Sequence, residues 1–321
     1  MENNYRFNQC WNLFQKWHRN RIEMHCIELA SPIKDYMEYP IEWNRSMPLF
    51  QYLQQIFKLY RQEVESWLNE NRKTDCTIDI EKIQNVCNLI IDIIKEEMLI
   101  DKPLFHRANG CCNKMIDLWN LLCLENYVSN ESLKGKEFFR LRKGQGLFSE
   151  VEFYHTPYDK FYLCGSCRFT PAGVPSLYLG YSKEVCMREV SSNDATIAKF
   201  KGISDYEFSI MDLTFRNQQK EIGNEMFYLW PILAACYVAV PREDDVNCVN
   251  YKEEYVFPQA LMKYVVCTKC IDGVKYYTCR NKNLNPTKNT DCNLALFAHY
   301  GKYNYDIDLM NKFAISDIHN I

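Results

Sequence analysis

Apolar residues recur at three- and four-residue steps through much of the first 130 positions, which is the spacing of one buried face of an α-helix. The longest example is SMPLFQYLQQIFKLYRQEVESWLNE, and its apolar positions are 49, 53, 56, 57, 60, 64, 67 and 68. Similar stripes predict helices in TIDIEKIQNVCNLIIDIIKEEMLI, in KMIDLWNLLCLENYV and around residues 11–29. Ser46, two residues before Pro48, is the expected N-cap of the longest helix. The opening part of the chain is therefore expected to be all-helical.

The pattern changes after residues 128–137, a polar stretch without a period that suits a linker. Short runs rich in aromatic and β-branched residues follow, separated by Gly, Pro, Asn and Asp, as is typical of strands joined by turns. These runs are EFFRLR, VEFYHT, FYLC, SLYLG, YEFSIMDL and GVKYYT, with helical patterns around 183–191, 230–240 and 254–265. Strands mixed with helices predict an α+β fold. The expected domains are a helical one, residues 1–131, and a mixed one, residues 132–321.

Composition and charge narrow the class of protein. The 321 residues, 47% of them hydrophobic, can bury a large core. The 38 Lys and Arg against 41 Asp and Glu leave a net charge of −3, which argues against nucleic acid or an anionic membrane as a partner. Any bound anion must therefore be held by local arginines.

Two further features suggest where the protein works. The 16 scattered cysteines, and an N-terminus without signal-peptide features, suggest free thiols in the cytoplasm. The longest apolar run, FYLWPILAACYVAV at 227–240, is shorter than the ~20 residues that cross a bilayer. It predicts a buried helix with Pro231 in its first turn.

Neither a nucleotide loop nor a metal site is expected from the motifs. KGQG at 143–146 lacks the further glycine and the Lys-Ser/Thr pair of nucleotide-binding loops, so it is interpreted as a turn. Two Cys-x-x-Cys pairs, at 164/167 and 267/270, could together bind zinc, but they lie too far apart for a compact zinc ribbon. The six histidines show no metal-binding spacing.

The stretch CGSCRFTPAGVPSLYLGYSKEVCMREV, residues 164–190, concentrates side chains suited to catalysis. In SLYLG, strand alternation puts the two leucines on one face and Tyr178 on the other, so buried leucines would turn Tyr178 toward a cleft. TPAGVP is interpreted as a turn, so Arg168 is expected on an adjacent strand or at its end, near the same cleft. The following helix, with Ser182 as its expected cap, carries Glu189 near its end.

These residue types suit a dinucleotide whose glycosidic bond is to be broken. The planar fork of arginine holds pyrophosphate through two hydrogen bonds. Tyrosine offers a flat face to nicotinamide and a hydroxyl that orients it. A carboxylate can bind ribose hydroxyls and stabilise the oxocarbenium-like charge that develops as nicotinamide leaves. Arg, Tyr and Glu occur together in many strand–helix units, however, so the pattern by itself does not identify an enzyme.

From about residue 138 to residue 300 the chain resembles the RES domain family, which is named for its Arg, Glu and Ser. FFRLRKG resembles the family's Tyr-Arg-x-Arg strand, and EFYHTPYDK resembles the segment with its His-Pro dipeptide. CRFTPAGVPSLYLGYSKEVCMREV is similar to the family's core of Arg-aromatic, Pro-Gly, Leu-Tyr-Leu and Glu. EYVFPQALMKYV and DGVKYYTCR resemble its Glu-Tyr-x-x-Pro-Gln and Asp-Gly-x-x-Tyr-x-Ser pieces, in the family's order.

The resemblance implies an α+β core similar to ADP-ribosyltransferase toxins and an activity that consumes NAD by cleaving its nicotinamide–ribose bond. Arg168, Tyr178 and Glu189 match the family's catalytic residues. The residues expected to bind the dinucleotide are Arg140, Arg142, His155 and Thr278, the last keeping the hydroxyl of the family's serine. Members commonly act as growth-halting toxins paired with an antitoxin. The helical N-terminal part resembles the HEPN-like extension that some members carry.

Three functions stay open. The first is a cytoplasmic NAD-degrading toxin or anti-phage effector without a metal, in which water or phosphate attacks the ribose carbon. The second is an ADP-ribosyltransferase that modifies a macromolecule. The third is a regulatory or RNA-interacting protein that would use His25 and two nearby arginines on a predicted helix, although a solvated helix face explains those residues equally. The sequence does not specify an antitoxin, a trigger or a homo-oligomer.

Overall fold

The computed structural model of the chain describes residues 11, 13–18, 41, 43, 45–71, 78–98, 113–146, 148–190, 194–214, 225–239, 252–279, 291–300 and 303–321. The chain divides into two units: the first covers residues 1–124, 218–247 and 256–260, and the second covers residues 125–217, 248–255 and 261–321. A helical region followed by an eight-stranded sheet confirms the predicted α+β class. The division into domains 1–131 and 132–321 stays a prediction.

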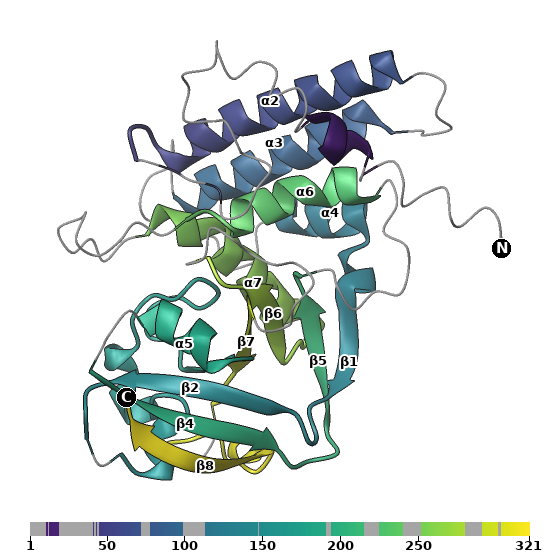
Figure 1. The fold of residues 1–321 in the computed structure, drawn as a ribbon. Coiled ribbons are helices and arrows are strands. Elements are labelled where there is room, and N and C mark those ends of the chain that lie inside the picture. The colour runs from purple at the N-terminus through teal and green to yellow at the C-terminus, as the bar shows by residue number, and fades with distance from the viewer. Residues whose placement is uncertain are drawn as a thin grey trace. The chain divides into compact units, whose positions relative to one another are not determined.

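The first unit is built from helices. Their bounds are Leu49–Glu70 for α2, Ile80–Glu97 for α3, Asn113–Leu122 for α4 and Glu225–Cys236 for α6. The apolar stripes predicted from the sequence are largely buried, and α3 contacts α2, α4 and α6 (Figure 1). Residues 13–18 are also helical, and the rest of the helix predicted around 11–29 lies outside the described residues. No helix in the described ranges has the length and apolar character needed to cross a membrane.

Two of these helices begin differently from the prediction. The N-cap of α2 is Pro48 and makes no side-chain cap bond, so Ser46 does not fill that role. The apolar helix α6 begins well before Pro231, which therefore lies in its interior rather than in its first turn. Proline has no N–H to give the carbonyl four residues earlier. The buried hydroxyl of Tyr60 donates to that carbonyl, of Phe227, at 2.9 Å, and so replaces a bond that α6 cannot make.

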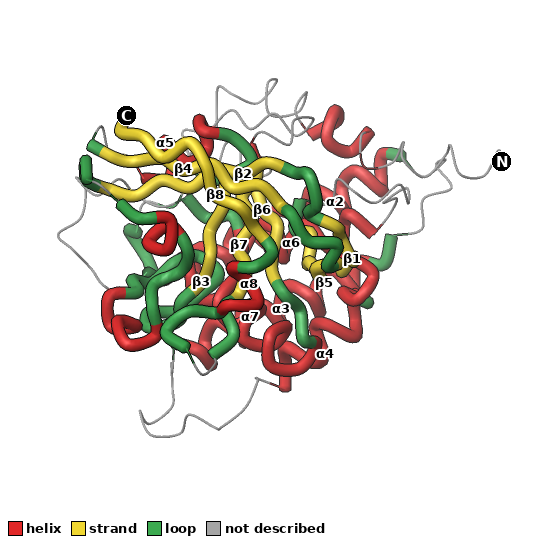
Figure 2. The backbone as a smooth tube through the Cα atoms, turned by 90° about the horizontal axis from the view of Figure 1, so that it is seen from below, coloured by secondary structure: helices red, strands yellow, loops and turns green. Residues whose placement is uncertain are grey.

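The second unit holds a sheet with the strand order β1-β5-β6-β7-β3-β2-β4-β8. The strands are Val128–Ser132 (β1), Glu137–Lys143 (β2), Ser176–Gly180 (β3), Ala195–Gly202 (β4), Glu207–Asp212 (β5), Gly273–Tyr277 (β6), Cys292–Phe297 (β7) and Phe313–Asn320 (β8). Neighbouring strands are antiparallel except β5 and β6. Seen from below, β8 lies along β4 and ends near the C-terminus (Figure 2).

The described residues form further α-helices and several 3-10 helices. The α-helices are α5 (Lys183–Val190), α7 (Val256–Lys269) and α8 (Ile307–Met310), and the 3-10 helices are Leu124–Tyr127, Glu150–Phe153, Tyr158–Leu163 and Glu253–Tyr255. The helical patterns predicted around 183–191, 230–240 and 254–265 are thus confirmed as α5, α6 and α7.

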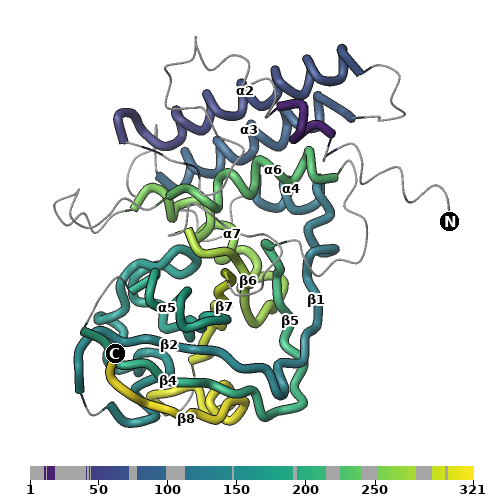
Figure 3. Tube along the Cα trace, in the orientation of Figure 1, coloured from purple at the N-terminus to yellow at the C-terminus, as the bar shows by residue number. Residues whose placement is uncertain are grey.

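Two predictions for the second unit are wrong. The polar stretch expected to be a linker contains β1, whose five residues all pair with β5 (Figure 3). The runs VEFYHT and FYLC contribute to 3-10 helices instead of strands. At the start of the first of these helices, the carboxylate of Glu152 accepts hydrogen bonds from the backbone N–H and the hydroxyl of Ser149, both at 2.8 Å, and this favours a helical start. Pro157 is the N-cap of the second and makes no side-chain cap bond.

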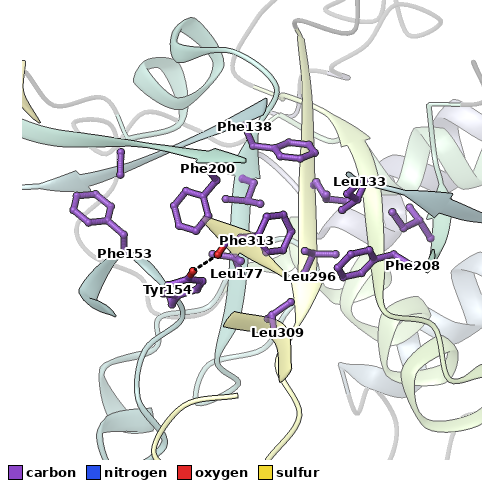
Figure 4. Close-up of a cluster of buried hydrophobic side chains, with 14 residues drawn as sticks. Leu133, Phe138, Phe153, Tyr154, Leu177, Phe200, Phe208, Leu296, Leu309 and Phe313 are labelled. Carbon is purple, nitrogen blue, oxygen red and sulfur yellow. Dashed lines mark hydrogen bonds between the residues drawn. The ribbon is translucent and has the colours of Figure 1, made fainter. Parts of the chain in front are cut away.

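One face of the sheet carries the main apolar core of the second unit (Figure 4). Strand β3 contributes Leu177 and Leu179, which are 0% and 1% exposed. The hydroxyl of Tyr154 donates to the backbone carbonyl of Phe313 at 2.9 Å and ties β8 to this core. Because successive strand residues point to opposite faces, Tyr178 lies on the other face and is half-buried, as the alternation in SLYLG predicts.

The pairing of the sheet changes abruptly between β2 and β3. These two strands share one paired position, Phe139 opposite Gly180, whereas β2 pairs with β4 along its whole length. In Figure 1, β2, β4 and β8 run across the view, while β5, β6 and β7 lie at a steep angle to them. Helix α5 contacts both strands at this junction. Glycine permits the close approach, since a Cβ on Gly180 would meet the Sγ of Cys186 at 2.6 Å.

We expect Gly180→Ala to lower the free energy of unfolding by about 1–3 kcal/mol, because the added methyl group would overlap the thiol of Cys186. Gly165→Ala is the matched control, since a Cβ at that position would meet no atom within 4 Å. Chemical denaturation followed by circular dichroism measures both variants. Equal stability of the two variants would contradict the close approach of α5 to β3.

Candidate active site

Helix α5 positions the first of the predicted site residues, Glu189. The hydroxyl of Ser182 accepts a hydrogen bond from the backbone N–H of Val185 at 3.2 Å, so Ser182 caps the helix as predicted. Val185 and Cys186 are buried. This buried side of the helix leaves Glu189 half-buried near the C-terminal end.

The sheet face opposite the apolar core collects polar side chains from three strands. Residues that are paired across neighbouring strands share a face, and Gly180, Asn293 and Tyr276 are paired in this way across β3, β7 and β6. Tyr178, two residues before Gly180, belongs to the same face. The side-chain amide of Asn293 donates to Oε1 of Glu189 at 3.0 Å, so the helix carboxylate reaches this face as well.

A short turn holds Arg168 next to Tyr178, so the expected place of Arg168 on a strand or at its end is wrong. The backbone N–H groups of Cys167 and Thr170 each donate to the other residue's carbonyl, at 2.9 and 3.3 Å, and close the turn around Arg168. The hydroxyl of Thr170 lies 2.9 Å from the hydroxyl of Tyr178. Burial, and after it Cys167, raises the pKa of Tyr178 well above its ordinary value. The hydroxyl of Tyr178 therefore keeps its proton at neutral pH.

Arg168 itself is withdrawn from solvent and surrounded by acidic and aromatic groups. Its side chain is 6% exposed, and its guanidinium carbon lies 5.1 Å from the centre of the Tyr255 ring. Burial alone would lower the pKa of Arg168. The nearby side chains of Cys279, Tyr255, Glu189 and Tyr276 nevertheless raise that pKa above its ordinary value. Arg168 is therefore a permanent buried cation.

Tyr276 lies among the three predicted catalytic residues, although it was not itself predicted as a site residue. Burial, followed by Glu189 and Tyr178, raises the pKa of Tyr276 well above its ordinary value, while Arg168 acts to lower it. Its ring centre lies 4.6 Å from that of Phe169. Tyr276 is the tyrosine of the Asp-Gly-x-x-Tyr-x-Ser piece, so the motif contained the signal that could have identified it.

Arg140 lies one position beyond the single pair that joins β2 to β3. Burial, and after it Arg142, lowers the pKa of Arg140 to about 10, against the opposite influence of Cys167, Cys186 and Tyr178. The guanidinium still carries its charge at neutral pH. Within the described residues, its buried Nη1 has no hydrogen-bond partner. A buried cationic nitrogen in this condition is costly, and an anionic ligand would satisfy it.

Arg142 and Thr278 have other neighbours. Burial lowers the pKa of Arg142, and the side chains of Glu152 and Tyr305 oppose that change. Thr278 is fully buried just after β6, and its backbone N–H donates to the carbonyl of Asp291 at 3.0 Å. The predicted contacts of both residues with a dinucleotide stay predictions.

His155 is fully buried, and backbone groups engage both of its ring nitrogens. Its Nε2 accepts a hydrogen bond from the backbone N–H of Asp306 at 2.9 Å, and its Nδ1 lies 2.8 Å from the carbonyl oxygen of Thr156. This pattern requires the proton on Nδ1 and describes a neutral histidine that joins two segments of backbone. The predicted contact of His155 with a ligand stays a prediction.

Lys252 was also missed by the sequence analysis. Its Nζ lies 5.0 Å from the centre of the Tyr255 ring, which Arg168 approaches as well. Lys252 also acts to lower the pKa of Cys167, which burial raises. A lysine ahead of a tyrosine gives no local signal of this placement, because it depends on where the turn around Arg168 lies.

The remaining sequence signals are the two Cys-x-x-Cys pairs and the group around His25. Cys164, Cys167, Cys267 and Cys270 are free thiols. In the part of the chain that the structure describes, no three His, Cys, Asp or Glu side chains are grouped as a metal site requires. His25 and the two arginines near it lie outside the described residues.

Comparison with known proteins adds one finding. No family model matches the chain. The chain is similar to a bacterial protein that is named as a toxin. That protein, "Putative toxin YopC" of Bacillus subtilis (strain 168), is 26% identical over 265 residues. The similarity covers 75% of this chain and 58% of the relative, so the chain spans little more than half of the relative's length.

The side chains described above offer cations, aromatic rings and a carboxylate to a bound molecule. Arg168 and Arg140 are cations withdrawn from solvent, and such groups bind phosphate oxygens strongly. Tyr178 and Tyr276 supply aromatic rings with protonated hydroxyls. Glu189 supplies a carboxylate held by a hydrogen bond, which can stabilise a developing positive charge.

We expect the stability of the protein to depend on pH through His155. Burial lowers the pKa of His155 below 6.5, against the opposite influence of Thr156 and Asp306. The unfolded chain therefore binds this proton more readily, and the stability from neutral His155 is present above about pH 6.5 and lost as the pH falls below it. In His155→Gln, an amide replaces the titrating ring, and the loss of stability between about pH 7.5 and pH 5.5 becomes smaller.

Chemical denaturation at the two pH values measures this difference. His319→Gln, at an exposed histidine, is the control and should behave as the unsubstituted protein. An equal loss of stability in His155→Gln and in the unsubstituted protein would show that His155 is not the group that titrates.

Proposed function

We propose that this chain is a RES-type enzyme that cleaves the nicotinamide–ribose bond of NAD and acts as a toxin or anti-phage effector in the bacterial cytoplasm. The observation that carries the proposal is the gathering of Arg168, Tyr178 and Glu189 around Tyr276. These are the residues of the RES-like motifs, and they come from a turn, two strands and a helix. The similarity to a protein named as a toxin supports the biological role.

The proposed roles follow from charge and placement. Arg168 and Arg140 bind the pyrophosphate of NAD, and the Nη1 of Arg140 gains the partner that it lacks among the described residues. Tyr178 orients the nicotinamide side through its ring and hydroxyl. Glu189 faces the ribose next to the bond that breaks. Arg142, His155 and Thr278 complete the expected contacts with the dinucleotide.

The reaction needs no redox partner. As the bond between ribose C1 and the nicotinamide nitrogen breaks, its electron pair leaves with nicotinamide and positive charge develops on the ribose. The carboxylate of Glu189 stabilises that charge. Water then forms a bond to C1 and releases a proton, giving ADP-ribose, or phosphate attacks instead and gives the 1''-phosphate. A cell that expresses such an enzyme needs an antitoxin, which we propose as the physiological partner.

We expect Glu189→Gln to lower kcat for nicotinamide release by about 10²-fold or more, because the amide cannot stabilise a cation and has nearly the same volume. Mass spectrometry of NAD incubated with the purified chain, with and without phosphate, measures nicotinamide and identifies its companion product. Glu184→Gln, at an exposed glutamate in the first turn of α5, is the matched control.

Three outcomes of this experiment bear on the proposal. Release by Glu189→Gln at the rate of the control would remove Glu189 from the chemistry. An ADP-ribose mass increment on an added macromolecule, in place of free ADP-ribose, would identify an ADP-ribosyltransferase. No release of nicotinamide by the unsubstituted full chain would contradict NAD cleavage itself.

We expect Arg168→Lys to raise the dissociation constant for NAD about tenfold or more, because an ammonium group cannot reproduce the bidentate fork of a guanidinium. Isothermal titration with Glu189→Gln as the background avoids turnover during the measurement. Arg188→Lys is the matched control, since Arg188 is a half-exposed arginine that pairs with Asp291 at 3.0 Å. Unchanged affinity in Arg168→Lys would exclude Arg168 from the binding site.

A further inference from the structure

Asn293 is the second residue of β7 and is 5% exposed. Its Nδ2 donates to Oε1 of Glu189 at 3.0 Å, although the two residues are 104 positions apart in the sequence. Strand pairing fixes its location, because Asn293 lies opposite Gly180 of β3 and opposite Tyr276 of β6. The side chain that holds Glu189 is therefore anchored in the middle of the sheet, and not in a loop.

A hydrogen bond from a buried amide affects a carboxylate in two ways. It restricts the rotation of the carboxyl group, so that the charge points in one direction. It also favours the ionised form, because an N–H donor binds a carboxylate better than a neutral acid. Both effects serve a carboxylate that must be charged and correctly aimed when positive charge develops on a substrate.

We propose that Asn293 is a positioning residue that orients the carboxylate of Glu189 toward the reacting bond. This inference rests on the proposed function, since it assigns Asn293 a part in the same reaction. Neither the RES-like motifs quoted above nor any local pattern around Asn293 indicates it.

A neighbouring contact separates this role from a general structural one. The guanidinium of Arg188, adjacent to Glu189 on α5, pairs with Asp291, two residues before Asn293, at 3.0 Å. Both bonds therefore join the same end of α5 to the same end of β7. Of these two bonds, the one from Asn293 reaches Glu189 and the other does not, so Asp291→Asn is a matched control that weakens the second bond.

The charged and titratable groups near Glu189 define what else could influence its protonation. They are Arg168 from the turn, Tyr276 from β6, Cys186 and Arg188 from α5, and Asp291 before β7. Tyr276 keeps its proton well beyond neutral pH and Arg168 keeps its charge, so neither changes state in the acidic range. Asp291 is also an acid, and Asp291→Asn therefore tests whether a change in the acidic range arises from it.

The test compares pH profiles of nicotinamide release for the unsubstituted full chain, Asn293→Asp, Asn293→Ala and Asp291→Asn. In Asn293→Asp a second carboxyl group takes the place of the amide, and two adjacent carboxylates cannot both ionise freely. We expect the acidic limb of the kcat profile to move to higher pH by about one unit or more, with activity partly recovered at alkaline pH. Asn293→Ala should lower kcat about tenfold with little change in KM. Asp291→Asn should keep the original limb.

A second measurement does not depend on turnover. Carbon-13 NMR at neutral pH observes the side-chain carboxyl groups, and Glu189→Gln identifies the resonance of Glu189. The chemical shift of that resonance should change in Asn293→Ala and Asn293→Asp, which lose the amide hydrogen bond, and stay in place in Asp291→Asn. Circular dichroism establishes that each variant is folded, and if Asn293→Asp does not fold, Asn293→Ala decides the question by the same two measurements.

The outcomes distinguish this inference from the proposed function. Absence of nicotinamide release from the unsubstituted chain overturns NAD cleavage, and with it the catalytic part of the inference, even where the carboxyl resonance of Glu189 moves. Release by the unsubstituted chain, with the same kcat and the same carboxyl resonance in the Asn293 variants, overturns the inference alone. A shift of equal size in Asp291→Asn would mean that Asn293 only fastens α5 to the sheet.

Discussion

The division of β3 between a core face and a site face is the constraint on which the rest of the second unit depends. Leu177 and Leu179 are almost fully buried on one side, so Tyr178 must lie on the other. A slip of one residue would exchange the faces and expose both leucines, which makes the register strongly specified. Because β7 and β6 pair in register beyond β3, the same constraint brings Asn293 and Tyr276 to the face of Tyr178.

The junction of β3 with β2 brings the candidate site residues together. One paired position joins the two strands, and Gly180 at that position allows α5 to pack closely enough for Glu189 to reach the sheet. The charges gathered there are unevenly balanced. Arg168 lies near the carboxylate of Glu189, whereas the Nη1 of Arg140 lacks a partner within the described residues. A buried cationic nitrogen in this condition is costly, and an anionic ligand would satisfy it.

Local patterns predicted the elements that local interactions stabilise. The stripes of α2 and α3, the alternation of SLYLG and the cap at Ser182 are all formed by residues close in sequence, and the structure confirms them. The predictions failed where a distant partner decides the outcome. The polar segment 128–132 is a strand because β5 supplies its hydrogen bonds. Pro231 is accepted inside α6 because the hydroxyl of Tyr60 donates to the carbonyl of Phe227, to which Pro231 cannot donate.

By itself, the sequence determined that one turn–strand–helix segment carries Arg168, Tyr178 and Glu189, since turn, strand and cap signals act over a few residues. Only the tertiary structure decided which residues join them. Asn293 meets Glu189 across 104 positions, and Nε2 of His155 accepts from the backbone N–H of Asp306 across 151 positions. Such contacts follow from strand register and packing, and the spacing of residues along the chain does not encode either one.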